Sequence, residues 1–225
     1  MTTARLSRVI VAVALTGLVA ATSACGSDDE GPVAASAAGS SAPSPLTGTA
    51  TSAAATVAAG PFGPGCAGLP AQGPGSIAAM AGLPVGTAVS QSPLLTTLTQ
   101  GVLAANLVDA VNTREDITVL APADAAFRAV DPPELSALLG DVPRLTTVLT
   151  HHVLPGRLTP AQLVGQHTTL NGDTVTISGS ATDLSVPADR TLAGARPATV
   201  VCGNIPTTNA TVYVIDQVLA PTAAG

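Results

Sequence analysis

The chain has 225 residues with a formal net charge of −6, and 46% of them are hydrophobic but only 1% aromatic. All eight basic residues are Arg, and the 14 acidic residues outnumber them; an acidic chain with no Lys and almost no aromatic rings is poorly suited to bind phosphates and stack bases, which argues against nucleic acid as a partner. The length allows one or two domains, whose core must be aliphatic, at about 1.5–3 kcal/mol for each fully buried side chain.

Residues 1–24 have the pattern of a signal peptide. Arg5 and Arg8 form a positive start, and the apolar stretch Val9–Ala21 that follows is too short to span a bilayer. A small residue precedes Cys25, as at the cleavage site of bacterial lipoproteins. We therefore expect export, cleavage before Cys25 and acylation of this residue, so that a lipid in the outer leaflet of the cytoplasmic membrane anchors the chain. Ordinary cleavage nearby, with Cys25 removed or unmodified, is the alternative.

Residues 25–60 are expected to form a linker. They consist mainly of Ala, Ser, Thr, Pro and Gly without a hydrophobic period, and they cannot bury enough apolar surface to offset the entropy of ordering. A flexible coil of this length reaches about 30–35 Å, and its Ser and Thr residues are candidates for O-glycosylation. Residues 61–91 are expected to be an extension of the folded domain, residues 92–222.

The folded region begins with helix signals. Ser92 followed by Pro93 predicts a helix start, and apolar residues at helical spacing extend this helix over Pro93–Val111. The apolar segment Ile117–Ala121 predicts a buried strand. Further helix signals lie at Leu135–Leu139, which follows a capping-box spacing at Asp131–Glu134, at Val142–His151, and at the cap signature Thr159–Gln162.

The later part of the region changes to strand signals. The dipeptide Asn171–Gly172 predicts the turn of a hairpin between Thr168–Leu170 and Thr174–Ile177. Further strands are predicted at Leu184–Val186, Thr199–Val201 and Thr211–Ile215. Helices that come first and strands that mostly follow indicate an α+β fold, and the absence of an internal repeat indicates a single domain.

Three segments far apart in this region resemble, in order, the conserved boxes of the fasciclin domain family. They are Thr118–Phe127, Leu149–Leu154 and Val212–Leu219, and the resemblance covers roughly Pro93–Pro221. It implies a single α+β domain in which N-terminal helices pack on a mostly antiparallel wedge of β-strands. It also implies adhesion or recognition rather than catalysis.

Within the boxes, the resemblance assigns structural roles. The first box implies a strand that ends at Pro122 and a short turn that packs Phe127 inward, and we expect Asp124 to cap that turn. In the central box His152 matches the family's His, and His151 stands where Tyr is usual. The last box implies a closing strand with an acidic residue. The motif residues expected to be structural are Pro122, Asp124, Phe127, His152, Tyr213 and Asp216.

With Cys25 acylated, two other Cys residues remain, Cys66 and Cys202. Disulfides persist in exported proteins, but two free thiols or a reactive Cys are the alternative on the residues alone. The surroundings of both residues resemble mycobacterial members of the fasciclin family, in which a Cys pair in these places is bridged. The resemblance thus implies a Cys66–Cys202 disulfide.

His151 and His152 are the residues that most invite a catalytic or metal-binding interpretation. Adjacent residues point in different directions on a helix and to opposite faces on a strand, so they make a poor chelating pair. We expect His152 to hydrogen-bond the backbone inside the fold and His151 to be half exposed. The chain has no zinc-binding spacing, no nucleophile elbow and no phosphate loop. Paired carboxylates of a hydrolase are a weak option, and we predict no catalytic residue, no metal and no cofactor.

The sequence therefore predicts a non-enzymatic, exported protein that is lipid-anchored to the outer face of the cell membrane or envelope, with partial secretion as an option. Its fasciclin-like domain is expected to bind an extracellular protein, glycan or lipid. The alternative is a carrier that holds a lipid or another apolar envelope molecule in a groove lined by aliphatic side chains.

Overall fold

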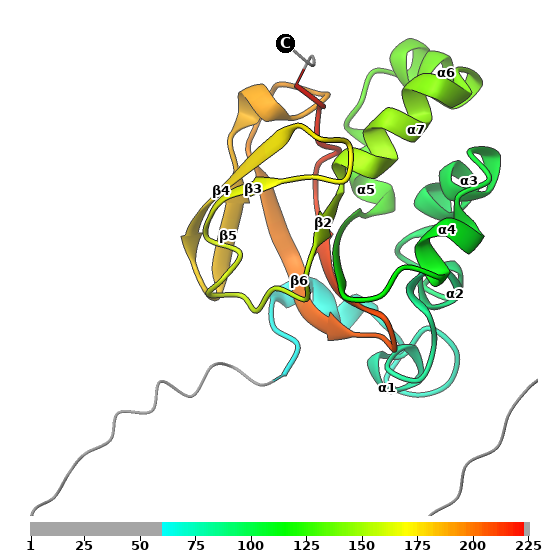
Figure 1. The fold of residues 1–225 in the computed structure, drawn as a ribbon, viewed down its shortest axis with the longest axis vertical. Coiled ribbons are helices and arrows are strands. Elements are labelled where there is room, and N and C mark those ends of the chain that lie inside the picture. Colours follow the sequence, from blue (N-terminus) through cyan, green and yellow to red (C-terminus); the bar gives the residue numbers. More distant parts are fainter. Residues whose placement is uncertain (1–59, 223–225) are drawn as a thin grey trace, which may run out of the picture. The chain divides into compact units, whose positions relative to one another are not determined.

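The computed structural model describes residues 60–222 (Figure 1), and the predicted signal peptide, Cys25 and the linker up to residue 59 lie outside them. The helices of this part are α1 (Ile77–Met80), α2 (Val85–Ser90), α3 (Thr96–Ala104), α4 (Val108–Asn112), α5 (Asp124–Arg128), α6 (Pro132–Gly140) and α7 (Val142–His151), with 3-10 turns η1 (Pro64–Gly68) and η2 (Ala188–Arg190). The strands are β1 (Ile117–Pro122), β2 (Val153–Pro155), β3 (Gly165–Thr168), β4 (Thr174–Ser180), β5 (Asp183–Val186), β6 (Ala198–Pro206) and β7 (Ala210–Ile215).

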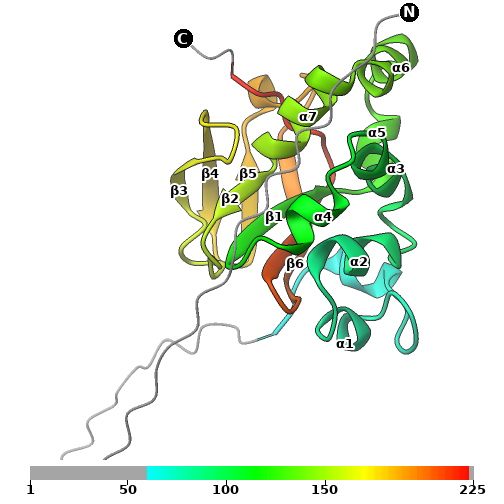
Figure 2. The same ribbon diagram turned by 45° about the vertical axis from the view of Figure 1, so that its right-hand side comes forward.

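The strands of the described residues form one curled sheet in the order β2-β1-β7-β6-β5-β4-β3. The β1–β7 pair is parallel, and the other neighbouring pairs are antiparallel. Leu170, just after β3, donates its N–H to the carbonyl of Val153 in β2 (2.8 Å), which draws the two edges of the sheet together. The predicted α+β class, with mostly antiparallel strands, is confirmed. The helices lie on one side of β1, and β3 to β5 lie on the other (Figures 1 and 2).

Two hydrophobic clusters lie on the two faces of the central strands, because successive strand residues point to opposite faces. Val212 and Val214 of β7 belong to the cluster under the helices, which also contains Phe127. Tyr213 and Ile215 belong to the second cluster, inside the curl of the sheet. All residues of β7 are buried, so this strand divides the two cores.

The predicted continuous helix over Pro93–Val111 is wrong, because the structure has two helices, α3 and α4, in its place. Asn106 has a φ of 54°, a left-handed conformation that ends α3. Its N–H and that of Leu107 bond back to the carbonyls of Leu103 and Val102 (both 3.0 Å), the pattern of a left-handed C-terminal cap. Apolar spacing alone does not reveal such a break, but Asn tolerates this conformation better than most residues.

The remaining helix and strand predictions agree with the structure to different degrees. Helix α7 has the predicted bounds. The predicted hairpin is formed by β3 and β4, but its first strand ends at Thr168, where the predicted arm Thr168–Leu170 begins. The three-residue strand β2 was not predicted, because it is too short to show a period. The Thr159–Gln162 signature forms its reciprocal hydrogen bonds, with Thr159 N donating to Gln162 Oε1 at 3.0 Å, but it starts only a single turn.

The capping box predicted at Asp131–Glu134 is wrong, although α6 begins there. The Asp131 side chain accepts no capping hydrogen bond. Glu134 instead forms an exposed ion pair with Arg144 of α7 (3.1 Å). An ion pair between two exposed side chains contributes little, about 0–1 kcal/mol.

The segment before α1 is held against β6. Cys66 in η1 forms a disulfide with Cys202. Phe62 exchanges two backbone hydrogen bonds with Gly203, of 3.1 and 2.8 Å. Gly203 has to be Gly, because a Cβ there would lie 2.6 Å from the Phe62 ring. Residues far apart in the sequence therefore join the extension to the sheet.

Candidate functional site

A cavity of ≈ 310 Å³ lies between α2, α3 and α4 on one side and β1, β2 and the end of α7 on the other. Fourteen of its 21 lining residues are Val, Leu or Ala. Its wall includes Leu103, which is the most exposed large hydrophobic residue of the described part, at 61%. The cavity thus combines an aliphatic interior with an apolar rim, which is the composition of a site for an apolar molecule.

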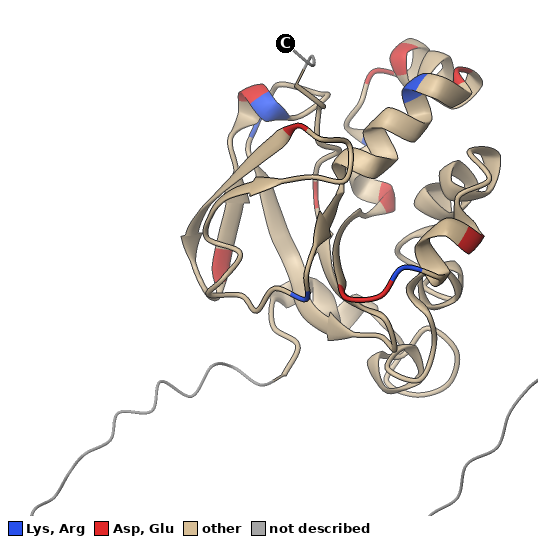
Figure 3. Ribbon diagram, viewed as in Figure 1, with Lys and Arg blue, Asp and Glu red and all other residues tan. Residues whose placement is uncertain are grey.

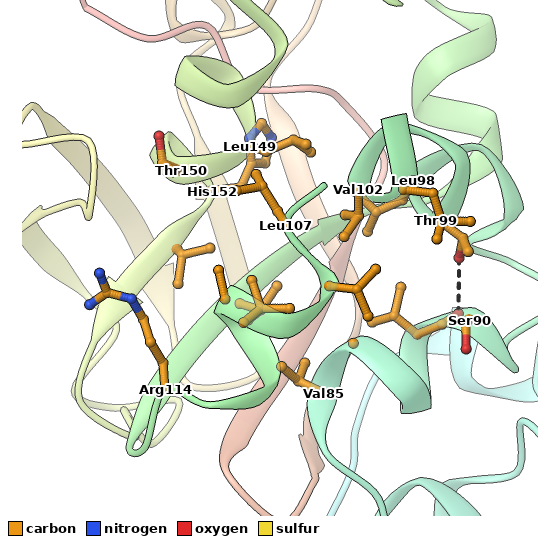
Figure 4. A pocket seen from close by; sticks show the side chains of 18 of the residues that line it. Val85, Ser90, Leu98, Thr99, Val102, Leu107, Arg114, Leu149, Thr150 and His152 are labelled. Atoms are coloured by element: carbon orange, nitrogen blue, oxygen red, sulfur yellow. Dashed lines mark hydrogen bonds between the residues drawn. The ribbon is translucent and has the colours of Figure 1, made fainter. Parts of the chain in front are cut away.

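The polar groups that line the cavity lie mostly at its margins. Figure 4 shows Leu107 between Arg114 at one end and Ser90 with Thr99 at the other. The lining contains one Arg and one His, which is His152, and no carboxylate. At neutral pH His152 is uncharged, because burial lowers its pKa to about 4. Arg114 is therefore the only charged group on the wall.

The left-handed cap at Asn106 shapes this cavity. By ending α3 it turns the chain so that Val102 of α3 and Leu107 after it both line the cavity. Val111 of α4 also lines the cavity. The break that the sequence pattern did not show is thus what folds two short helices around the space.

Asn209 holds the walls in place from the turn before β7. Its side chain is buried, and its Oδ1 accepts the N–H of Val85 at the start of α2 (2.8 Å). Its Nδ2 donates to the carbonyls of Val111 (2.8 Å) and Arg114 (2.7 Å) around the end of α4. One side chain thus joins α2, α4 and the β6–β7 turn. No sequence signal shows these long-range bonds.

The family-motif residues do not converge on one site. Pro122 ends β1 beside Ile215 of β7, and Phe127 is buried in the cluster under the helices. Tyr213 is buried on the other face of the sheet, donates its hydroxyl to the carbonyl of Leu158 (2.8 Å), and has its pKa raised by burial. Asp216 accepts hydrogen bonds from Thr199 N and Arg196 Nη1 (both 2.7 Å). Each of these residues stabilises contacts in a different part of the fold.

The central His pair occupies the junction of α7, the β3–β4 turn and the C-terminal segment. His152 Nδ1 donates to the carbonyl of Val148 (2.7 Å), and its Nε2 accepts the N–H of Leu219 (2.9 Å). The expectation that His151 is half exposed is wrong: it is 1% exposed, and its Nδ1 lies 2.7 Å from a carboxylate oxygen of Asp173. The residue that draws His151 inward lies 22 positions away, so local sequence could not show it.

Asp124 caps a different element from the one predicted. Its Oδ1 accepts the N–H of Thr97 (2.7 Å) and its Oδ2 the hydroxyl of Thr96 (2.7 Å), at the start of α3. The turn that contains Phe127 has Ala123 as its N-cap, without a side-chain bond. Burial raises the pKa of Asp124, but the hydrogen bonds from Thr97 and Thr96 outweigh it, and the pKa is lowered overall.

Asp124→Ala is expected to lower the free energy of unfolding by about 1–2 kcal/mol, the usual cost of losing a helix cap. Because the folded pKa lies below the unfolded value, this contribution is present above pH 3.8 and is lost as the pH falls through the folded pKa. Urea denaturation at neutral pH measures it. Asp131→Ala is the matched control, since that side chain makes no capping bond. Equal losses in the two variants would contradict the assignment of Asp124 as the cap of α3.

The described part of the chain contains neither a membrane-spanning helix nor a cluster of metal-binding side chains. No helix within residues 60–222 has the length and apolarity needed to cross a membrane. Nor does this part bring together three His, Cys, Asp or Glu residues that could hold a metal ion. Charged residues are scattered over the ribbon rather than gathered on one face (Figure 3).

The comparisons with known proteins agree with this architecture. The model of the fasciclin domain matches residues 93–221. The chain is 42% identical over 190 residues, 81% of this chain and 82% of the relative, to the cell surface glycolipoprotein MPB83 of Mycobacterium bovis and equally to MPT83 of Mycobacterium tuberculosis. It is 41% identical over 169 residues, 72% of this chain and 82% of the relative, to the immunogenic protein MPB70 of M. bovis.

Among solved structures, a FAS1 domain pair from the insect cell adhesion molecule fasciclin I matches with a TM-score of 0.49 and 15% identity. The match covers 63% of this chain and 51% of that one, so the chain spans about half of its length. The family match covers more than half of the chain, and the relatives above cover more than two thirds of it. The chain belongs to the fasciclin domain family.

Proposed function

We propose that the chain is a non-enzymatic recognition protein of the cell surface that binds a lipid or another apolar envelope molecule in the cavity between α2, α3, α4 and β1. The observation that supports this role is the aliphatic lining, which contains no carboxylate and one Arg. Burial of such a ligand would contribute about 25 cal/mol for each Å² of apolar surface removed from water. Of the three partner classes expected from the sequence, the cavity favours the lipid, and with it the carrier alternative.

A protein or glycan partner has less support from the described surface. Interface hot spots are enriched in Trp, Tyr and Arg. The chain has no Trp, its one Tyr is buried, and of its two Phe residues Phe127 is buried and Phe62 is packed against Gly203. An exposed aromatic anchor is therefore missing from residues 60–222, which weakens the adhesion hypothesis for macromolecules.

The location of the protein is a proposal that rests on sequence and on its relatives. Cleavage after residue 24, acylation of Cys25 and a linker to residue 60 would place the folded domain, with its extension 61–91 and core 92–222, outside the membrane. Relatives named as cell surface glycolipoproteins, at 42% identity, support this arrangement. Those relatives and the immunogenic protein are named for surface location or antigenicity, and none of them is named as an enzyme.

A variant in which a larger side chain blocks the cavity is expected to bind no lipid there. Val102 of α3 is partly exposed and lines the cavity, so Val102→Phe places a ring where the ligand would lie. Solvent extraction and mass spectrometry of protein purified from its native envelope should yield about one lipid per wild-type chain and less than about a tenth of that from the variant. The intact mass after extraction reports the separate, covalent acyl group on Cys25.

Val142→Phe is the matched control, since Val142 is exposed at the start of α7 and does not line the cavity. It should retain the wild-type amount of lipid. A wild-type protein that carries no stoichiometric lipid, or a Val102→Phe variant that retains it, would rule out the cavity as the binding site. An unmodified N-terminus after residue 25 would exclude the lipid anchor while leaving the cavity proposal intact.

A further inference from the structure

The cavity has room for one hydrocarbon chain. Its volume of ≈ 310 Å³ lies at the lower end of the range of small-molecule sites, about 300–1,000 Å³. A lipid with two acyl chains would leave one chain in water, and each methylene group that stays exposed would forgo about 0.8 kcal/mol of binding free energy. If the cavity binds an apolar molecule, as proposed above, its size therefore favours a single-chain ligand.

Arg114 supplies a charge at one end of this space. It lies in the loop between α4 and β1, and its carbonyl is held by Asn209 Nδ2 (2.7 Å), so the backbone beneath the side chain is fixed. The side chain is exposed and lines the cavity. It takes part in none of the ion pairs found among residues 60–222. Its guanidinium is thus available to a ligand.

The acidic residues next to Arg114 do not neutralise it. In the α4–β1 loop a basic segment is followed directly by an acidic one (Figure 3). Asp116 of that acidic segment pairs with Arg157 (3.3 Å). Glu115 forms no ion pair with Arg114 within residues 60–222, and neither does Asp109 on α4. On an acidic chain with no other charged group on the cavity wall, Arg114 is the one place where an anionic head group gains attraction.

The opposite end of the cavity suits the tail of such a ligand. Leu98 and Val89 are buried on that side. Thr99 donates its hydroxyl to the carbonyl of Leu95 in the preceding turn (2.9 Å), and Ser90 donates its hydroxyl to the carbonyl of Thr87 (2.7 Å), so neither presents a free donor to a ligand. The polarity of the cavity therefore falls from the Arg114 end to the end formed by α2 and α3 (Figure 4).

We propose that the cavity binds a single-chain anionic amphiphile of the fatty-acid type, with its alkyl chain among α2, α3 and α4 and its carboxylate paired with Arg114. The head group gives the ligand a fixed orientation, and the chain supplies most of the affinity through apolar burial. The assignment rests on the proposed function and adds the ligand's class and its orientation.

Calorimetric titration with decanoate and with 1-decanol tests this assignment on the exported protein after bound lipid has been removed. The two probes share an alkyl chain and differ in charge. Wild-type protein should bind decanoate more tightly. Arg114→Gln should weaken decanoate binding about three- to tenfold and leave 1-decanol unchanged, because it removes one exposed charge pair. Arg128→Gln is the matched control: Arg128 is also exposed and without an ion pair among residues 60–222, but it does not line the cavity.

The outcomes separate this inference from the function on which it rests. Equal wild-type affinity for both probes, or an equal ratio in wild type and Arg114→Gln, would overturn the anionic ligand and leave an apolar-ligand site standing. Failure of both probes to bind wild-type protein would overturn the apolar-ligand function itself. The single-chain assignment would be overturned if a diacyl phospholipid bound wild-type protein more tightly than decanoate and if Val102→Phe abolished this binding.

Discussion

Loss of the Cys66–Cys202 disulfide is expected to lower the free energy of unfolding by about 4–5 kcal/mol, the largest single effect that the structure predicts. The bridge joins residues 136 positions apart, and in the chain-entropy model the constraint on the unfolded chain grows with the length of the closed loop. It also holds η1 and Phe62 against β6, so the folded extension loses its fixed position when the bridge is absent.

The measurement is urea denaturation of wild-type protein and of Cys66→Ser, each with and without a reducing agent. Cys66 is the better residue to change because Cys202 is fully buried and its truncation would add a cavity. Wild-type protein should lose the full amount on reduction, and Cys66→Ser should be equally unstable in both conditions. A wild-type protein whose stability does not respond to reduction would show that the bridge is absent.

Acidification is expected to lower the free energy of unfolding by about 3 kcal/mol between pH 6.5 and pH 4 through His152 alone. Burial lowers the pKa of His152 from 6.5 to about 4. Above pH 6.5 the residue is neutral in both states and costs nothing. Below pH 6.5 the unfolded chain binds a proton that the folded chain excludes, so stability falls until the folded residue also titrates near pH 4.

The geometry explains why the folded protein rejects this proton. Nδ1 already donates to Val148, and Nε2 accepts the N–H of Leu219, so a proton on Nε2 would face another donor. The ring of His151 lies next to it, with ring centroids 6.1 Å apart; of the neighbouring titratable residues, His151 opposes protonation of His152 and Asp173 favours it. Protonation thus breaks the bond that holds the segment after β7 to α7.

Urea denaturation between pH 7 and pH 4 should show the slope in wild-type protein and a reduced slope in His152→Gln, so that the two stabilities approach each other at low pH. His167→Gln is the control, since His167 is only partly buried and bonds the Leu163 carbonyl (3.0 Å). Asp173 acts in a lower window: burial raises its pKa, but the bonds from Thr169 and His151 lower it overall, so its contribution is lost only below pH 3.8. An unchanged slope in His152→Gln would refute the assignment.

Local signals predicted the elements whose cause lies within a few residues. Helix α7 has a strong apolar period, and Asp141 caps it by accepting the N–H of Arg144 (3.1 Å). The hairpin of β3 and β4 turns near Asn171–Gly172, with Gly172 at a φ of 87°, as the dipeptide predicted. In both cases neighbours in the chain supply the hydrogen bonds and conformations that decide the element.

The predictions that failed depend on partners far away in the chain. Asp124 had a plausible local cap, but it binds the start of α3, 27 and 28 residues before it. His151 is predicted to be half exposed, but in the structure it is buried beside Asp173. A capping oxygen bonds whichever unpaired N–H groups the fold presents, and the sequence pattern does not rank local against distant ones.

The sequence by itself determined the family, the α+β class and an aliphatic core, because box order, periodicity and composition are properties of the chain alone. Only the tertiary structure decided the cavity, its single cation Arg114 and the Asn209 bonds that span 124 positions to Val85. A cavity is a volume that the side chains of several distant elements leave unfilled, and its charge depends on which residues happen to border it. Neither quantity exists until helices, strands and turns have packed, so no pattern of neighbouring residues can encode it.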